Sequence, residues 1–156
     1  TTVVYRKALS DLTAAWNKKH QNQFNPPTTP TFIIGDISSC KYPEDVDLVI
    51  CEDTLPYITP VNLQPTLAKI FKALRLGGIF VGTIFFEPST KDPDLELIRK
   101  IGAHFYPSKE IALEIISRSG FEIRQSQEKI SKPGHPNTCV HFLAVKPKKP
   151  NVYLVV

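Results

Sequence analysis

The stretch VDLVICEDTLPYI, residues 46–58, decides the fold, because an apolar run stops abruptly at Cys51-Glu52-Asp53. The run Asp47–Cys51 predicts a buried β-strand. In an open α/β sheet, ligands bind in the crevice at the carboxyl ends of the strands. The two acids are therefore expected to face such a crevice. There they can accept hydrogen bonds from an amine or a ribose hydroxyl, or balance a positive charge.

A second apolar segment has the same kind of ending. Phe32–Ile34 predicts a buried strand, and Gly35-Asp36 follows it directly. Since the carboxyl ends of parallel strands meet at one edge of a sheet, Asp36 and Glu52 are expected to share one cleft.

Helical patterns lie between the predicted strands, and their ends carry recognisable signals. Thr59-Pro60 is a good helix start, with Thr as N-cap and Pro at the first position. The glycine pair Gly77-Gly78 is expected to end that helix by adopting positive φ. Ser108 is expected to cap a later helix, which Gly120 ends. That later helix is expected to turn three isoleucines inward: Ile111, Ile115 and Ile116.

The remaining pattern completes an α/β fold with a mostly parallel sheet. Ile79–Phe86 is nearly all apolar, which suits a central strand covered on both faces. Two long strands joined by a turn near the end of the chain predict an antiparallel pair at one edge, Phe121–Ile130 with Thr138–Lys146. Short elements are also predicted elsewhere, namely strands at Thr2–Tyr5 and Val152–Val156 and helices at Leu9–Trp16 and Leu95–Ile101.

Length and composition fit a single globular domain spanning residues 1–156. No apolar run approaches the roughly 20 residues that cross a bilayer, so no membrane partner is expected. Three widely spaced cysteines form no zinc set and fit a reducing cytoplasm. The net charge of +4 keeps nucleic acid open as a partner, although no basic run with interleaved aromatics supports it.

Four stretches in order carry a resemblance to the class I S-adenosylmethionine-dependent methyltransferases. They are FIIGDISS (32–39), VDLVICEDTLPYI (46–58), LAKIFKALRLGGIFVGTIF (67–85) and HFYPSKEIALEIISRSGFEI (104–123). The resemblance covers roughly Thr31–Lys146. It implies a Rossmann-like sheet with an antiparallel strand pair at its C-terminal end, and S-adenosylmethionine as cofactor.

The resemblance also implies roles for particular residues. Asp36, with Ile37 beside it, would contact the adenine amino group. Cys51 and Glu52 would lie along the methionine part of the cofactor, and Tyr57 would close the methyl-transfer site. Each has a structural alternative: Asp36 capping a turn, Glu52 solvated, and Tyr57 packing in the core.

A general acid or base is needed only if the acceptor carries a proton that must leave early. Glu87, just past the Ile79–Phe86 strand, is the best-placed candidate for that role, with His104 and Tyr106 behind it. The alternative for Glu87-Pro88 is that it simply ends the strand.

The sequence departs from the family pattern at its start. The family's glycine-rich loop follows the first strand, whereas the first glycine here is Gly35. The resemblance therefore implies that the chain begins one βα unit late. Arg6 also falls near the position of an acid that grips the ribose hydroxyls, and a cation cannot accept those hydrogen bonds.

Three functions follow from these observations. The first is an S-adenosylmethionine-dependent methyltransferase acting on a small-molecule or protein acceptor. The second is a non-catalytic methyltransferase-like scaffold or partner-binding module that has lost the cofactor loop. The third is another nucleotide-binding α/β domain, such as a nicotinamide-dependent one. No metal site is expected, and a homo-oligomer remains open.

Overall fold

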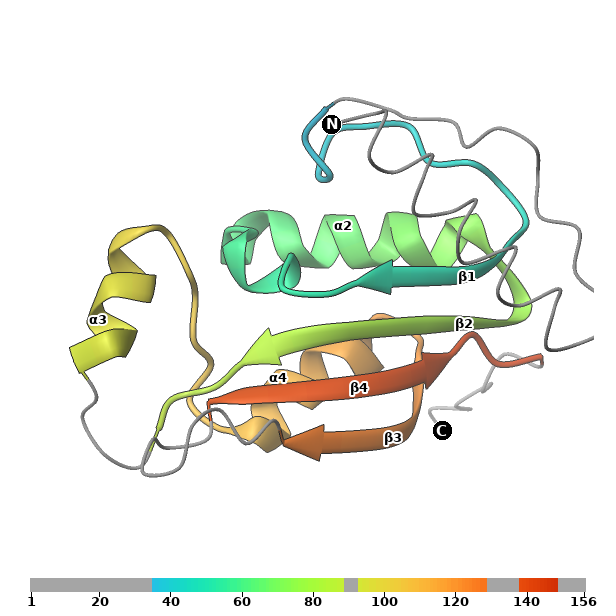
Figure 1. Ribbon diagram of the computed structural model, residues 1–156. Helices are drawn as coiled ribbons and strands as arrows, with labels where there is room; N and C mark the ends of the chain where they lie inside the picture. The colour runs from blue at the N-terminus through green and yellow to red at the C-terminus, as the bar shows by residue number, and fades with distance from the viewer. Residues whose placement is uncertain (1–34, 89–92, 129–137, 149–156) are drawn as a thin grey trace, which may run out of the picture. The chain divides into compact units, whose positions relative to one another are not determined.

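The computed structural model describes residues 35–88, 93–128 and 138–148, all of which except Gly35 belong to the unit that begins at Asp36. Strands and helices alternate along most of this part of the chain (Figure 1). The elements are β1 (Val46–Cys51), the 3₁₀ turn η1 (Leu55–Tyr57), α2 (Pro60–Ala73), β2 (Leu74–Phe85), α3 (Pro93–Lys100), α4 (Lys109–Arg118), β3 (Glu122–Glu128) and β4 (Cys139–Val145). Predictions at Thr2–Tyr5, Arg6, Leu9–Trp16, Phe32–Ile34 and Val152–Val156 lie outside the described residues.

The described strands form one sheet in the order β1-β2-β4-β3. β1 pairs with β2 in parallel, and α2 makes the crossover between them. β4 pairs antiparallel with both β2 and β3. The mixed α/β sheet is therefore confirmed, and so is the antiparallel pairing of the two last predicted strands.

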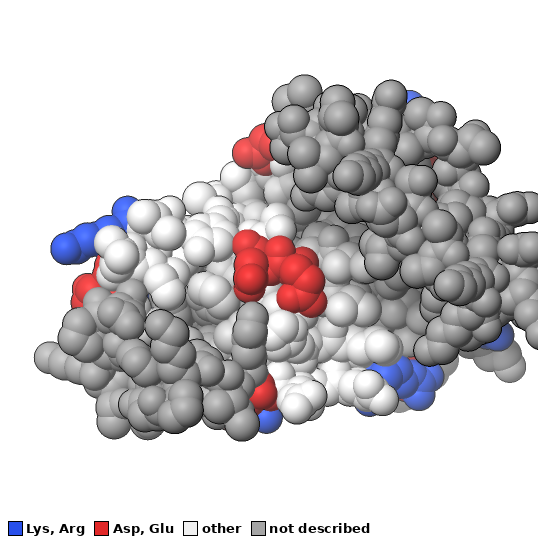
Figure 2. Space-filling model, in the orientation of Figure 1, with Lys and Arg blue, Asp and Glu red and all other residues white. Residues whose placement is uncertain are grey.

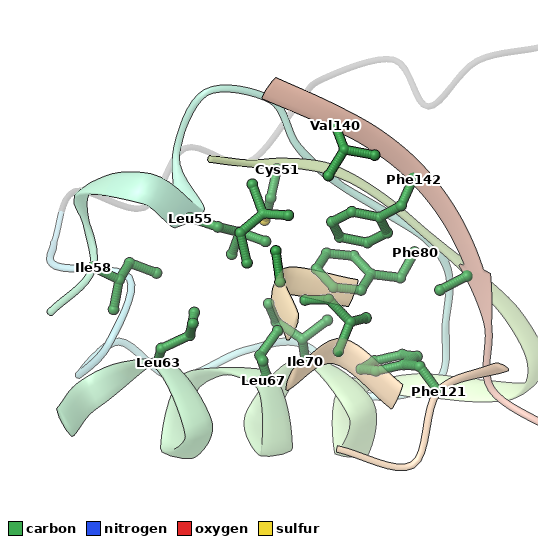
Figure 3. Close-up of a cluster of buried hydrophobic side chains, with 14 of the residues drawn as sticks. Cys51, Leu55, Ile58, Leu63, Leu67, Ile70, Phe80, Phe121, Val140 and Phe142 are labelled. Atoms are coloured by element: carbon green, nitrogen blue, oxygen red, sulfur yellow. The ribbon is translucent and has the colours of Figure 1, made fainter. Parts of the chain in front are cut away.

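One face of this sheet packs against α2 and α4. Figure 3 shows side chains from α2 and from the strands pointing toward one another in the resulting core. The rings of Phe80 and Phe142, from neighbouring strands, meet edge to face with centroids 5.1 Å apart. The most completely buried apolar members include Leu63, Leu67, Ile70, Phe80, Ile84, Ala112, Ile116, Val140, Phe142 and Ala144.

The opposite face of the sheet leaves large apolar side chains exposed. Leu48 pairs with Ile79 and Ile50 pairs with Val81, so these four side chains share that face. Ile50 is 61% exposed and Ile79 is 37% exposed. The expectation that β2 is covered on both faces is therefore wrong at Ile79. No helix within the described ranges has the length and apolar character that a bilayer crossing requires.

The glycine pair Gly77-Gly78 does not end α2, contrary to the prediction. The helix starts at Pro60 after the N-cap Thr59, as predicted, but it ends at Ala73. Leu74 already has an extended backbone and begins β2.

Instead, the glycines allow an irregular entry into β2. The β1–β2 register shifts between Val46, which pairs with Leu74, and Leu48, which pairs with Ile79. Gly77 has φ +76°, and a Cβ on Gly78 would lie 2.9 Å from the Arg75 carbonyl oxygen. Only glycine avoids that contact without a backbone shift.

Helix α4 follows its predicted end signals. Ser108 is the N-cap, and its hydroxyl accepts a hydrogen bond from the Ile111 amide. Gly120, with φ +96°, follows the C-cap Ser119. Of the three isoleucines expected inward, Ile116 is fully buried and Ile115 is half-buried, whereas Ile111 is exposed. Ala112 is fully buried as well, because α4 turns a slightly different face to the sheet than its isoleucines suggest.

Two glycines at equivalent helix ends allow backbone strain to be separated from a steric clash. Gly120 and Gly102 both have φ near +97°. A Cβ on Gly120 would lie 3.0 Å from the Phe71 ring, whereas a Cβ on Gly102 would meet nothing within 4 Å. We expect Gly102→Ala to cost about 1–2 kcal/mol from backbone strain alone. Gly120→Ala should cost about 1–3 kcal/mol more.

Denaturant unfolding of both variants measures these costs. Equal losses of stability in the two variants would contradict the clash with Phe71.

Candidate functional site

Two exposed acids form a tight turn where β1 ends. Figure 2 shows acidic side chains gathered on this face of the molecule. Glu52 and Asp53 are both exposed, and Asp53 has a left-handed backbone with φ +46°. The Thr54 hydroxyl donates a 2.9 Å hydrogen bond to the Glu52 carbonyl, which closes the turn. The two acids therefore follow the end of β1 directly and are exposed, whereas the crevice that they are expected to face stays a prediction.

Two residues that the sequence interpretation missed contact these acids. The Asp53 amide donates to the Thr83 hydroxyl oxygen at 2.6 Å, and that hydroxyl lies 3.3 Å from Asp53 Oδ1. His141 Nδ1 lies 3.4 Å from Glu52 Oε2. The available signal was weak: Thr83 and His141 are polar residues inside otherwise apolar strands.

Cys51 turns its side chain into the core rather than toward a ligand. It is buried beside Leu55 (Figure 3). Burial raises the pKa of the Cys51 thiol to about 11, because the low-dielectric core disfavours the thiolate. The thiol is therefore neutral at pH 7, and a ligand at this position would meet the backbone of Cys51 more than its sulfur.

Asp36 caps its own turn, which is the structural alternative stated above. Its Oδ1 accepts hydrogen bonds from the Ser38 hydroxyl at 2.5 Å and from the Ser38 amide at 2.7 Å. These hydrogen bonds lower the pKa of Asp36. Among the described residues, no hydrogen bond falls on Oδ2. One carboxylate oxygen therefore holds the turn while the other faces solvent.

An apolar groove lies along β1 and joins the two predicted halves of the site. It has a volume of about 300 Å³, and Ile37 and Cys51 both line it. The Tyr42 hydroxyl, at one wall, donates to the Ile37 carbonyl at 2.5 Å. The groove therefore brings together the neighbours of Asp36 and Glu52, although the cleft shared by the two acids themselves stays a prediction.

Glu87 is held in an ion pair instead of standing ready as a base. Arg99 reaches it with two nitrogens, Nη1 to Oε1 at 3.0 Å and Nη2 to Oε2. The same guanidinium lies 4.3 Å from the centre of the Phe105 ring. Both carboxylate oxygens of Glu87 are therefore occupied by Arg99.

The other predicted residues lie around the ends of β2 and η1. Tyr57 is 42% exposed, so it is not core packing. The His104 amide donates to the Pro56 carbonyl at 2.7 Å, and the Tyr106 amide donates to the Phe85 carbonyl at 3.0 Å. These backbone bonds tie segment 104–106 to η1 and β2. Half-burial raises the pKa of Tyr106, so its deprotonated form, which a general base requires, is scarcer at neutral pH.

The described residues contain no group of three or more His, Cys, Asp or Glu side chains that could hold a metal ion. The groups that the candidate site does present are carboxylates, hydroxyls and backbone groups. They suit a ligand with amines and hydroxyls.

The family model for the methyltransferase domain matches residues 5–82, which is half of the chain. The match includes β1, α2, the acidic turn and most of β2. The chain therefore belongs to the methyltransferase domain family. The resemblance to S-adenosylmethionine-dependent methyltransferases inferred from the sequence is confirmed.

Solved structures support the same fold. An S-adenosylmethionine-dependent methyltransferase from Methanosarcina mazei is 17% identical, with a TM-score of 0.56, over 90% of this chain and 79% of that one. A Haemonchus contortus N-methyltransferase in complex with S-adenosylhomocysteine is 16% identical, with a TM-score of 0.56, over 72% of this chain and 36% of that one.

A third similar structure belongs to a different class of enzyme. The [4+2]-cyclase SpnF is 17% identical, with a TM-score of 0.60, over 87% of this chain and 61% of the cyclase. The chain thus spans less than two thirds of both the cyclase and the Haemonchus protein. At these identities the likeness concerns the fold. No curated protein sequence matches this chain.

The Cys51 thiol provides a pH test of how this end of β1 is packed. Its pKa is about 11 in the folded protein, against an ordinary value of 9.0. The folded state therefore holds the thiol proton more tightly than the unfolded state does. The resulting stability is fully present below pH 9 and is lost as pH rises toward 11. We expect a loss on the order of 2–3 kcal/mol across that window.

Urea unfolding of the wild type and Cys51→Ala at several pH values between 8 and about 10.5 isolates this contribution, because other groups titrate alike in both proteins. A stability difference that does not shrink as pH rises would show that the thiol is not desolvated.

Proposed function

We propose that this chain is part of an S-adenosylmethionine-dependent methyltransferase. The family match, which includes the acidic turn and most of its partner strand β2, is the observation that carries the proposal. The methyl acceptor is a small molecule or a protein. Nucleic acid is a weaker candidate, supported only by the net charge of +4.

The residues at the carboxyl ends of the strands fit this cofactor. S-adenosylmethionine supplies a methyl group on a sulfonium, and transfer to a nucleophile leaves a neutral thioether. Glu52 and Asp53 offer exposed carboxylates that can accept hydrogen bonds from the ammonium or hydroxyl groups of such a ligand. The solvent-facing Oδ2 of Asp36 can accept from an adenine amino group while Oδ1 keeps its turn.

The site favours catalysis by positioning over catalysis by a strong base. Both carboxylate oxygens of Glu87 are engaged by Arg99, so neither is turned toward an acceptor. Holding the acceptor in line with the methyl group supplies much of the acceleration in such a displacement. The family resemblance implies that Tyr57 covers the transfer site, and the exposure of its ring supports that role. An acceptor that needs no early deprotonation, such as a neutral amine, suits this site best.

Two observations favour a second candidate function, that of a non-catalytic module. The [4+2]-cyclase shares this fold, so the fold by itself does not require methyl transfer. The Glu87–Arg99 ion pair removes the best-placed base among the predicted residues. Both observations are compatible with a methyltransferase-like scaffold or partner-binding module. A cytoplasmic location is also proposed, since the Cys40 and Cys51 thiols are free.

Calorimetric titration with S-adenosylmethionine and S-adenosylhomocysteine tests the enzyme proposal. Asp36→Asn keeps an acceptor for Ser38 at Oδ1 and replaces Oδ2 with a donor, so it tests the adenine contact without breaking the turn. We expect affinity to fall about 5- to 150-fold, the scale of one unpaired polar partner. Glu52→Gln should lower the affinity less than Asp36→Asn does, because the side chain of Glu52 is 45% exposed.

Glu114→Gln, an exposed acid on α4 paired with Arg118, serves as the matched control and should bind like the wild type. Absence of binding to the purified wild type would favour the scaffold. Binding that ignores Asp36→Asn would show that the adenine contact lies elsewhere.

A further inference from the structure

Thr83 is a fully buried hydroxyl in the middle of a largely apolar strand. Its exposed fraction is 0%, and its neighbours in β2 are Gly82 and Ile84, also buried. A buried hydroxyl is costly unless it is hydrogen-bonded. Both interactions recorded for Thr83 Oγ1 go to Asp53, one with its amide and one with its carboxylate. Val would fit this strand position equally well. The position is instead occupied by Thr83, whose hydroxyl hydrogen-bonds to the acidic turn.

These hydrogen bonds matter because the backbone of Asp53 has an unusual conformation. Its φ of +46° is uncommon for any residue other than glycine, although Asp tolerates it better than most. The hydroxyl accepts from the amide at 2.6 Å and lies in donor range of Oδ1 at 3.3 Å. One side chain of β2 therefore orients both the backbone and the carboxylate of Asp53.

His141, on the neighbouring strand β4, contacts the adjacent acid, Glu52. Thr83 and His141 are direct partners in the antiparallel register of β2 and β4, so they lie side by side on one face of the sheet. His141 Nδ1 lies 3.4 Å from Glu52 Oε2. Two consecutive acids at the end of β1 are thus each contacted by one member of a single cross-strand pair.

Stability alone gives a weak reason for this arrangement. Glu52 and His141 are partly exposed, and ion pairs of that kind contribute little to folding, roughly 0–1 kcal/mol. The contacts do, however, restrict the direction of two carboxylates that face solvent. Restricting groups before a ligand arrives reduces the cost of binding it.

We propose that Thr83 and His141 are positioning residues that hold Asp53 and Glu52 in the orientation used for ligand binding. This inference rests on the proposed function for the identity of the ligand, S-adenosylmethionine. Asp53 and Glu52 then form a preset pair, which means that contacts with β2 and β4 determine the orientation of both carboxylates before the ligand binds. Thr83 and His141 themselves need not touch the ligand.

Paired variants separate positioning from packing. Thr83→Val keeps the shape and removes the hydroxyl, whereas Thr83→Ser keeps the hydroxyl. His141→Leu removes the ring nitrogens, whereas His141→Asn keeps a donor near the position of Nδ1. Gln127→Leu is the control, because Gln127 pairs with His141 on β3 and, within the described residues, makes no hydrogen bond with either acid.

Two measurements are made on each variant: hydrogen exchange at the Asp53 amide, followed by NMR, and the Kd for S-adenosylmethionine. Thr83→Val should speed exchange at Asp53 about 3- to 10-fold, the scale of one net hydrogen bond. Thr83→Val and His141→Leu should each raise the Kd by about 3- to 10-fold. Thr83→Ser and His141→Asn should restore values close to the wild type, and Gln127→Leu should change neither quantity.

The outcomes distinguish this inference from the proposed function. If the wild type binds the cofactor and Thr83→Val speeds exchange without changing the Kd, the positioning role is wrong. If Thr83→Val leaves exchange unchanged, Thr83 does not hold the turn, whatever the cofactor does. If the wild type does not bind the cofactor, the proposed function fails, and the exchange data still decide whether Thr83 presets Asp53.

Discussion

Parallel pairing of β1 with β2 brings the ends of two strands, separated along the chain by α2, to one edge of the sheet. The contacts of the acidic turn depend on that pairing. The acidic turn follows β1, and its hydrogen-bonding partner Thr83 comes from β2. A shift of one residue in the register would move Thr83 to the core face and leave Asp53 without its hydroxyl partner.

The pairing is held in place mainly by the core on the other face of the sheet. Phe80 and Ile84 of β2 are completely buried there, alternating with Val81 and Thr83 on the site side. Helix α2 contributes Leu67, whose exposed fraction is also 0%. The alternation of side chains along β2 thus links apolar burial to placement of the polar group, because the same strand supplies both.

Chemistry in this fold is decided by loops at the strand ends, and those of this chain are mostly acidic and hydroxyl-bearing. The fold accommodates methyltransferases and a [4+2]-cyclase, so the acids carry more information about function than the sheet does. The Glu87–Arg99 ion pair at the end of β2 is a further charged feature that distinguishes this chain from the bare fold. Glu52 and Asp53 are the exposed carboxylates at the carboxyl end of β1.

By itself, the sequence was enough to predict the elements whose signals are local. The N-cap Ser108, the terminating Gly120 and the antiparallel final strands are as expected, because capping, positive φ and hydrophobic patterning act over a few residues. The apolar run at β1 does form a strand, but the prediction that this strand is buried is wrong, because Leu48 and Ile50 are exposed and only Cys51 is buried. The acidic turn was also predicted from the residues that follow β1.

Only the tertiary structure decided which groups meet. Glu87 and Arg99 are 12 residues apart, and Asp53 and Thr83 are 30 apart, so no local pattern predicts either contact. The glycine pair Gly77-Gly78 resembles a helix end in sequence, yet in the structure it lies at the irregular entry into β2. The close approach of Gly78 to neighbouring backbone atoms exists only once the chain is folded. Hydrogen-bond partners across strands depend on register, and register is a property of the assembled sheet.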